Sequence, residues 1–242
     1  MTHRLNLQAD ELKLLMLTMG STAMPGAEAL TVTENTMPTL SARDSLVEKG
    51  IIVRQSDGQF SLIDTAALIV HICLEPRGFL HGVWYAGEEQ TELFNIYFQK
   101  KDIVLLRRDN QNKYELLWVP TLPLAAGGLL NFMRTPQAQV SHEMGAYPWL
   151  TEAGESWQNT LKRFMQAHAG ITPSSYTRFT TEGGDSALAA EHYYMHADGV
   201  AYMAAVDGET ARLFKPDQAD AAKALSKWMA YTHRACLMEE AE

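Results

Sequence analysis

Two stretches of the chain decide the fold, because they can be laid over each other without a gap at a spacing of 96 residues. The first is FNIYFQKKDIVLLRRDNQNKYELLWVPTLPLAAGGLLNFM, residues 94–133, and the second is AEHYYMHADGVAYMAAVDGETARLFKPDQADAAKALSKWM, residues 190–229. Extended to 87–133 and 183–229, the overlay has ten identical residues in 47 positions. Ordinary composition would give roughly three or four. The overlay therefore predicts an internal duplication.

The shared residues fall where local geometry would require them. Asp102 and Asp198 fall in predicted hairpin turns, and Pro120 and Pro216 end the last predicted strand of each copy. Two unrelated units of hairpins and a helix remain the alternative explanation. The identical pairs are Gly87/Gly183, Tyr97/Tyr193, Asp102/Asp198, Val104/Val200, Leu117/Leu213, Pro120/Pro216, Ala125/Ala221, Ala126/Ala222, Leu129/Leu225 and Met133/Met229.

The duplicated unit is predicted to contain strands followed by a helix, and one further strand precedes it in each half of the chain. Short apolar runs separated by turn residues predict strands, and the short connections predict an antiparallel meander. The predicted strands are 80–85, 91–99, 103–108 and 114–119 in the first half, and 176–181, 188–195, 200–206 and 210–214 in the second. The predicted helices are 122–133 and 219–238, with a further amphipathic helix at 156–169 and a linker at 134–150.

The N-terminal part has the element order of a winged-helix module. Apolar residues at helical spacing predict a helix over 7–19, and Ser41 with Asp44 forms a capping pattern at the start of a second helix. Asp57-Gly58 lies between two short apolar runs and predicts a β-hairpin, which a buried helix over 65–74 follows.

These patterns predict an α+β protein with two antiparallel sheet-plus-helix repeats, related by a quasi-two-fold axis, and a winged-helix-like N-terminal segment. The predicted divisions are 1–78 for the N-terminal segment, 79–135 for the first repeat, and 136–242 for the linker, helix and second repeat. We expect 78–242 to form one compact unit.

The charge balance disfavours a nucleic-acid partner. The chain has 29 acidic and 20 basic residues, a net charge of −9, and an acidic protein repels the phosphate backbone unless its basic residues gather on one face. The second predicted helix has Arg43 and Lys49 among acidic residues, and the hairpin adds only Arg54. A transcriptional regulator with a duplicated ligand-sensing region is the alternative function.

The sequence has no motif that predicts catalysis, a cofactor or a metal. Nucleotide-binding glycine loops and the nucleophile elbow are missing, and His142-Glu143 lacks the second histidine of a zinc-protease helix. His192 and His196 lie four residues apart on a predicted strand, too far apart to share one metal ion. The carboxylates Glu88-Glu89 and Asp185 fall in turn tips, where solvation is expected.

The cysteines and the chain start indicate a cytoplasmic protein. Only Cys73 and Cys236 are present, which is typical of a reducing compartment, and we expect them to be small buried residues. The N-terminal residues lack a signal-peptide pattern, and no apolar run is long enough to span a membrane.

The predicted strands are rich in aromatic residues. One face of an antiparallel sheet forms the core, and a partly uncovered aromatic face on the other side would bind a protein partner. The alternative is that all of these residues are core. The residues predicted to contact a partner are Trp84, Tyr97, Trp118, Tyr193 and Tyr202.

In layout the chain resembles the EspG family, cytoplasmic chaperones that accompany type VII (ESX) secretion. The resemblance lies in the opening LNLQADELKLLMLTMG, the following Met24-Pro25, the helix–hairpin ARDSLVEKGIIVRQSDGQFSL and the duplicated meander-plus-helix. It implies an α+β fold with quasi-two-fold sheet repeats and the binding of secreted substrates before export. It carries over no individual functional residue.

Together these observations predict a non-enzymatic cytoplasmic binding protein, chaperone-like, with a secreted helical protein as its client. An apolar part of the client would bind at the aromatic sheet surface or at the junction of the two repeats, with a few aromatic anchors contributing most of the affinity.

Overall fold

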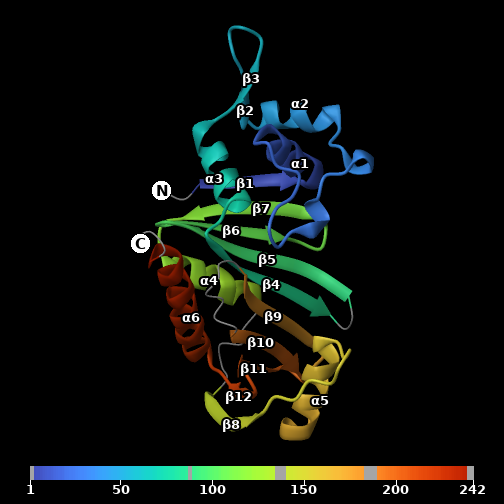
Figure 1. The fold of residues 1–242 in the computed structure, drawn as a ribbon, viewed down its shortest axis with the longest axis vertical. Coiled ribbons are helices and arrows are strands. Elements are labelled where there is room, and N and C mark those ends of the chain that lie inside the picture. The colour runs from blue at the N-terminus through green and yellow to red at the C-terminus, as the bar shows by residue number, and fades with distance from the viewer. Residues whose placement is uncertain (1–2, 87–88, 134–139, 183–189, 239–242) are drawn as a thin grey trace.

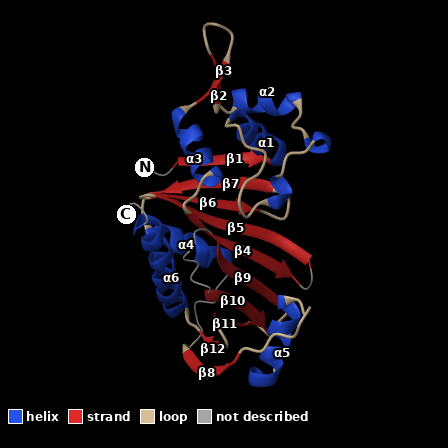
Figure 2. Ribbon diagram, viewed as in Figure 1, coloured by secondary structure: helices blue, strands red, loops and turns tan. Residues whose placement is uncertain are grey.

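A computed structural model describes residues 3–86, 89–133, 140–182 and 190–238 of the chain. Its centre is one ten-stranded antiparallel sheet, in the order β1-β7-β6-β5-β4-β9-β10-β11-β12-β8. Figure 2 shows this sheet running through the whole molecule, with helices against it and a small two-stranded hairpin beyond one end. The predicted α+β class is confirmed.

Two repeats build most of the sheet and meet in its middle (Figure 1). The first consists of β4 (Gly78–Ala86), β5 (Glu89–Gln99), β6 (Asp102–Arg108), β7 (Lys113–Val119) and α4 (Leu122–Met133). The second consists of β9 (Ser175–Glu182), β10 (Ala190–Ala197), β11 (Val200–Asp207), β12 (Thr210–Lys215) and α6 (Gln218–Met238). Strands β4 and β9 pair antiparallel, with Gly82 opposite Phe179, as expected where a two-fold axis crosses a sheet.

The helices bury both faces of the sheet. On one face, α4 and α6 pack together and cover apolar residues of both repeats. On the other face, α1 and α3 cover the first repeat. Helix α5 (Trp157–Ala169) covers the second repeat there; Ser156 accepts the backbone N–H of Asn159 at its start, and Gly170 ends it in a left-handed conformation.

The helices of the two repeats keep the predicted spacing of 96 residues. Ala125 and Leu129 of α4 are completely buried against the sheet, and so are Ala221 and Leu225 of α6, within 1 %. The repeated Ala and Leu positions are therefore the faces by which both helices pack.

The strands do not keep that spacing, and the gapless overlay is wrong there. The β10–β11 turn is Asp198-Gly199, between the paired residues Ala197 and Val200. The β5–β6 turn is Lys100-Lys101, so Asp198 corresponds to Lys100, a spacing of 198 − 100 = 98 residues, and both have φ near +50°. Asp102 is the first residue of β6 instead of a turn residue.

The last strand of each repeat also departs from the predicted register. Leu117 of β7 packs with α4, whereas Leu213 of β12 packs on the α5 side. Because side chains alternate along a strand, an error of one residue exchanges the two faces. The connections differ in length: two residues separate the paired Asp207 and Thr210, and five separate Arg108 and Tyr114.

The N-terminal segment contributes a strand that the sequence did not predict. Strand β1 (His3–Gln8) pairs with β7 at the sheet edge, and α1 (Ala9–Thr18) starts only after it. Gln8 and Glu11 form a capping box at this junction. The predicted boundary at residue 78 stays a prediction, but β1 lies in the same sheet as the repeats.

The rest of this segment follows the predicted helix–hairpin–helix order. It consists of α2 (Leu40–Glu48), β2 (Ile52–Arg54), β3 (Phe60–Leu62) and α3 (Asp64–Leu74), after two short 3-10 turns at Glu28–Leu30 and Glu34–Thr36. The β2–β3 hairpin projects away from the main sheet (Figure 1).

A second unpredicted strand lies at the opposite edge of the sheet. Strand β8 (His142–Pro148) pairs with β12, although its residues belong to the predicted linker 134–150. The prediction failed because Gly145 and Pro148 are typical of loops; at an edge, both are tolerated. In the described residues, no helix is long and apolar enough to cross a membrane.

Candidate functional site

The five aromatic residues predicted to contact a partner do not form one surface. Trp84, Tyr97, Tyr193 and Tyr202 are between 0 and 6 % exposed. Trp84 lies under α4 and α6, Tyr97 on the opposite face of the first repeat, and Tyr193 and Tyr202 beneath α5. Their role in partner binding stays a prediction; in this structure they form the core.

Trp118, the fifth of these residues, is half-buried on β7. Its ring stacks on that of His3, with centroids 5.6 Å apart. It therefore lies at the edge where β1 joins the sheet, away from the second repeat.

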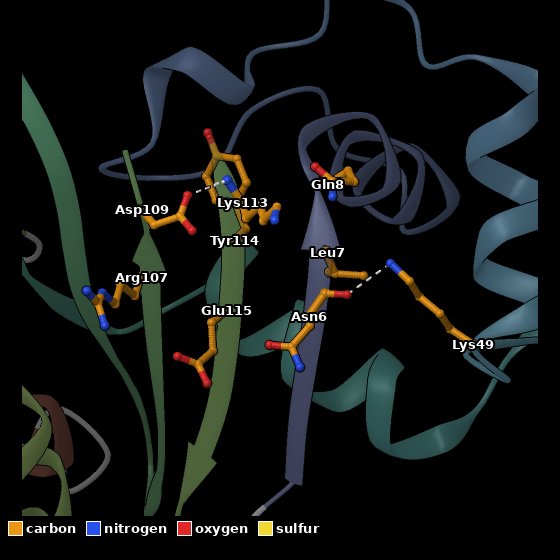
Figure 3. A pocket seen from close by; sticks show the side chains of 9 residues that line it. All are labelled: Asn6, Leu7, Gln8, Lys49, Arg107, Asp109, Lys113, Tyr114 and Glu115. Atoms are coloured by element: carbon orange, nitrogen blue, oxygen red, sulfur yellow. Dashed lines mark hydrogen bonds between the residues drawn. The ribbon is translucent and has the colours of Figure 1, made fainter. Parts of the chain in front are cut away.

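A polar cavity of about 430 Å³ opens beside β1, β6 and β7 (Figure 3). Most of its charged groups are already paired. Lys49 bonds the Glu11 carboxylate at 2.6 Å, Arg107 bonds Glu92 at 2.9 Å, and Glu115 accepts from Arg4 at 2.7 Å. The lining residues are Asn6, Leu7, Gln8, Lys49, Arg107, Asp109, Lys113, Tyr114 and Glu115.

The pKa of Glu11 shows the effect of these ion pairs and hydrogen bonds. Burial would raise the pKa of its carboxyl group, but hydrogen bonds from Lys49, Ser45 and the backbone of Gln8 outweigh that effect, and the pKa is lowered. The carboxylate is a fixed anion that joins α1, α2 and β1. We interpret this cavity as a structural junction, since most of its ionised groups have partners within the chain.

A second cavity, of about 530 Å³, has an apolar floor and is bordered by charged side chains. It lies between the first turns of α6 and the strands β11, β12 and β8; we call it the α6 groove. Its apolar lining is Met203, Phe214, Pro216 and Ala224, and its polar lining is Ser141, Glu143, Arg212, Asp220, Lys223 and Lys227.

The floor of the α6 groove is a row of residues directly opposite one another on neighbouring strands. Tyr194 lies opposite Met203, Met203 opposite Phe214, and Phe214 opposite Glu143. Cross-strand neighbours share a face of the sheet, so this row leads from the buried core under α6 to the open end of the sheet. Met203 is 5 % exposed and Phe214 is half-buried.

Two lysines dominate the charge of the α6 groove. Arg212 pairs with Glu143 at 3.4 Å, and the hydroxyl of Ser141 donates to Asp220. Lys223 and Lys227 are exposed, one helical turn apart, and neither amine has a hydrogen bond or ion pair within the described part of the chain. The groove therefore offers apolar surface beside two lysines that form no direct ion pair with any described carboxylate.

The equivalent place in the first repeat is closed. A Cβ on Gly128 would lie 2.9 Å from Cδ1 of Leu105, so α4 lies directly on its strands at this point. The α6 groove stays open because α6 leans toward the first repeat, where it contacts α4, β4 and β5.

Comparison with known proteins gave a match in structure alone. No family model matches the sequence, and no curated protein matches it. A solved structure of the Mycobacterium tuberculosis type VII secretion system chaperone EspG5, in complex with a PE25–PPE41 dimer, matches with a TM-score of 0.64 and 12 % identity. The match covers 90 % of this chain and 94 % of EspG5. The two chains share a fold.

The EspG-like layout expected from the sequence is thus supported at the level of the fold. Identity of 12 % with EspG5 carries over no residue role. The α6 groove was not predicted, because its floor comes from strands whose register the overlay misplaced. The one signal of this groove in the sequence was the helical spacing of Lys223 and Lys227 beside the small residue Ala224.

The histidines singled out in the sequence have separate surroundings. His192 is buried with its ring centroid 4.4 Å from that of Trp228; burial lowers its pKa to about 4, and its Nδ1 has no hydrogen-bond partner among the described residues. Nε2 of His196 lies 3.2 Å from the backbone oxygen of Met133. His142 is exposed on β8.

Neither a metal site nor a reactive thiol is present among the residues that the structure describes. They contain no group of three or more His, Cys, Asp or Glu side chains placed to hold a metal ion. Cys73 is fully buried, and burial raises the pKa of its thiol well above the usual value. Glu88, Asp185 and the side chains of Glu89 and Cys236 lie outside the described residues.

Proposed function

We propose that this protein is a non-enzymatic, chaperone-like binding protein whose client is a helical protein secreted by a type VII (ESX) pathway. The observation that carries the proposal is the likeness of fold to EspG5, a type VII chaperone solved with a protein dimer bound. We assign the protein to the cytoplasm, where such a client would be held before export.

The α6 groove supports this proposal, because it combines an apolar floor with charged rims. Protein-binding surfaces have apolar centres and polar borders, with a few buried anchors contributing most of the affinity. The groove lies at the outer edge of the second repeat, on β11, β12 and β8, and away from the β4–β9 junction at which the duplication suggested that a partner would bind.

Trp118 belongs to the proposal as a secondary contact, since it is the half-buried member of the five predicted aromatic residues. The other four predicted residues contribute indirectly, by supporting the sheet from within the core. They are Trp84, Tyr97, Tyr193 and Tyr202.

The test is co-expression of the tagged protein with each small helical protein encoded beside its gene. We expect one of them, or a pair, to be insoluble alone and to co-purify with this protein in a stoichiometric complex by size-exclusion chromatography. If every neighbouring helical protein is soluble alone and elutes separately, the proposal is wrong. Salt-dependent binding of promoter DNA, without any protein complex, would favour the regulator instead.

A further inference from the structure

We propose that the α6 groove is the docking site for an amphipathic helix of the client, and that the polar edge of this helix carries carboxylates. The inference rests on the proposed function and names the chemistry of the client segment. The apolar stripe of the client helix would lie on Met203, Phe214 and Ala224, while Lys223 and Lys227 would bind its acidic side chains.

The shape of the α6 groove favours a helix lying along it. The groove follows the first turns of α6 on one side and the ends of β12 and β8 on the other. The groove, of about 530 Å³, has room for several apolar side chains. It is too small to enclose a whole helix, whose diameter with side chains is about 10 Å. A bound helix would therefore insert one face and leave its polar edge beside α6, where the two lysines are.

The charges of the α6 groove select an acidic partner. Across the chain, Arg4, Arg107 and Arg178 have carboxylate partners, and the net charge is −9. Within the groove, Arg212 pairs with Glu143, and Asp220 accepts only from the neutral hydroxyl of Ser141, so the five ionised side chains of the lining carry a net charge of 3 − 2 = +1. Two lysines one helical turn apart, with no partner among the described residues, match carboxylates at the same spacing on a second helix.

The comparison of the two repeats shows how the groove arises from the sequence. At the helix spacing of 96 residues, Lys223, Ala224 and Lys227 replace Gly127, Gly128 and Asn131 of α4. The small residue Gly128 lets α4 press against Leu105. On α6 the packing position holds Ala224, whose methyl group needs more room than Gly128 does, and the exposed positions beside it hold Lys223 and Lys227. This part of the second repeat therefore combines an apolar floor with charged side chains.

The experiment uses two fluorescein-labelled peptides of about five helical turns. Both carry leucines at helical spacing; one has glutamates at the flanking positions, and the other has lysines there. Fluorescence anisotropy measures binding to the wild-type chain, to the variant Lys223→Glu/Lys227→Glu, and to a control, Lys101→Glu/Lys113→Glu. The control makes the same change in net charge at exposed lysines of the first repeat.

We expect the acidic peptide to bind the wild type and the control equally well. The groove variant should lose about tenfold or more in affinity for it, since two attractions become repulsions. The basic peptide should bind the groove variant better than the wild type, a reversal that loss of folding would not produce.

The proposal is overturned if both peptides bind the wild type alike, or if the control loses as much affinity as the groove variant. It is also overturned if sedimentation shows a wild-type dimer that the groove variant abolishes, because a second copy would then occupy the groove.

The two proposals fail separately. If a neighbouring client co-purifies equally with the wild type and with Lys223→Glu/Lys227→Glu, the groove assignment is wrong and the chaperone function stands. If no client is found for the wild type, the function fails, whatever the peptides do.

Discussion

The ammonium group of Lys49 lies 2.6 Å from Oε2 of the buried Glu11 carboxylate and also donates to the backbone oxygen of Asn6 at 3.1 Å. One side chain after the end of α2 thus holds α1 and the edge strand β1 together. It also occupies a backbone acceptor of β1, which discourages the addition of another strand at this edge.

Replacing Glu11 with Ala should lower the free energy of unfolding by about 3 kcal/mol, because Lys49, Ser45 and the Gln8 N–H lose a buried acceptor. Urea unfolding at pH 7 measures this change. Since the pKa of Glu11 is lowered on folding, its stabilisation is present above its usual pKa and is lost as the pH falls below it, so the wild type and the variant should converge in acid.

The matched control is Asp44→Ala, which breaks the exposed pair with Arg43. It should cost less than about 1 kcal/mol. Equal losses for the two variants would show that burial of Glu11 has no energetic role.

Replacing Gly82 with Ala should destabilise the centre of the sheet by about 1–3 kcal/mol. Its Cβ would lie 2.4 Å from Cε1 of Phe179, the residue directly opposite on β9. Phe179→Leu should remove the clash, so in a double-mutant cycle the second substitution should cost less in the Gly82→Ala background than in the wild type.

The control for this cycle is Gly127→Ala in α4. An added Cβ there meets no atom within 4 Å, so helix propensity should dominate and stabilise the protein by about 0.5–1 kcal/mol. Additive effects of Gly82→Ala and Phe179→Leu would contradict the predicted contact.

Acid should weaken the protein through His192. Its pKa is lowered from 6.5 to about 4 by burial, so the unfolded state binds the proton more readily. The stabilisation from the neutral ring is complete above pH 6.5 and falls between pH 6.5 and 4, by up to about 3 kcal/mol. Unfolding free energies measured across this range should fall less steeply for His192→Leu than for the wild type.

His142→Asn is the control, because His142 is exposed on β8. Its pH profile should match that of the wild type. If His192→Leu keeps the full slope between pH 6.5 and 4, another group causes it.

The buried hydroxyl of Tyr97 should stabilise the loop that precedes α2. It donates to the backbone oxygen of Pro25 at 2.7 Å, and Asn95 Nδ2 donates to the oxygen of Gly26 at 2.9 Å. Tyr97→Phe should cost about 1–2 kcal/mol by leaving the Pro25 oxygen with one partner fewer. Limited proteolysis should then cut within 20–39 earlier than in the wild type.

Tyr202→Phe serves for comparison, since its ring is also buried, in a different cluster. It should leave cleavage of the 20–39 loop unchanged. Faster cleavage in both variants would point to a global loss of stability.

The sequence predicted the repeats, the helices and the hairpin, because each depends on local residue patterns. It failed on β1 and β8, whose strand conformation depends on pairing with β7 and β12 at the sheet edges. It also failed on the strand register, since turn lengths differ between repeats and identical residues such as Leu117 and Leu213 point to opposite faces. The α6 groove depends on that register and on the tilt of α6, neither of which a single sequence contains.

The central pairing of β4 with β9 has a consequence for synthesis on the ribosome. Trp84 meets Thr177, its partner across that pair, only after another 177 − 84 = 93 residues have been made. At roughly 5–20 residues per second, this takes several seconds or more. During that interval the inner edge of β4 exposes unpaired backbone groups, so the half-made chain is itself a candidate for chaperone protection until its second repeat emerges.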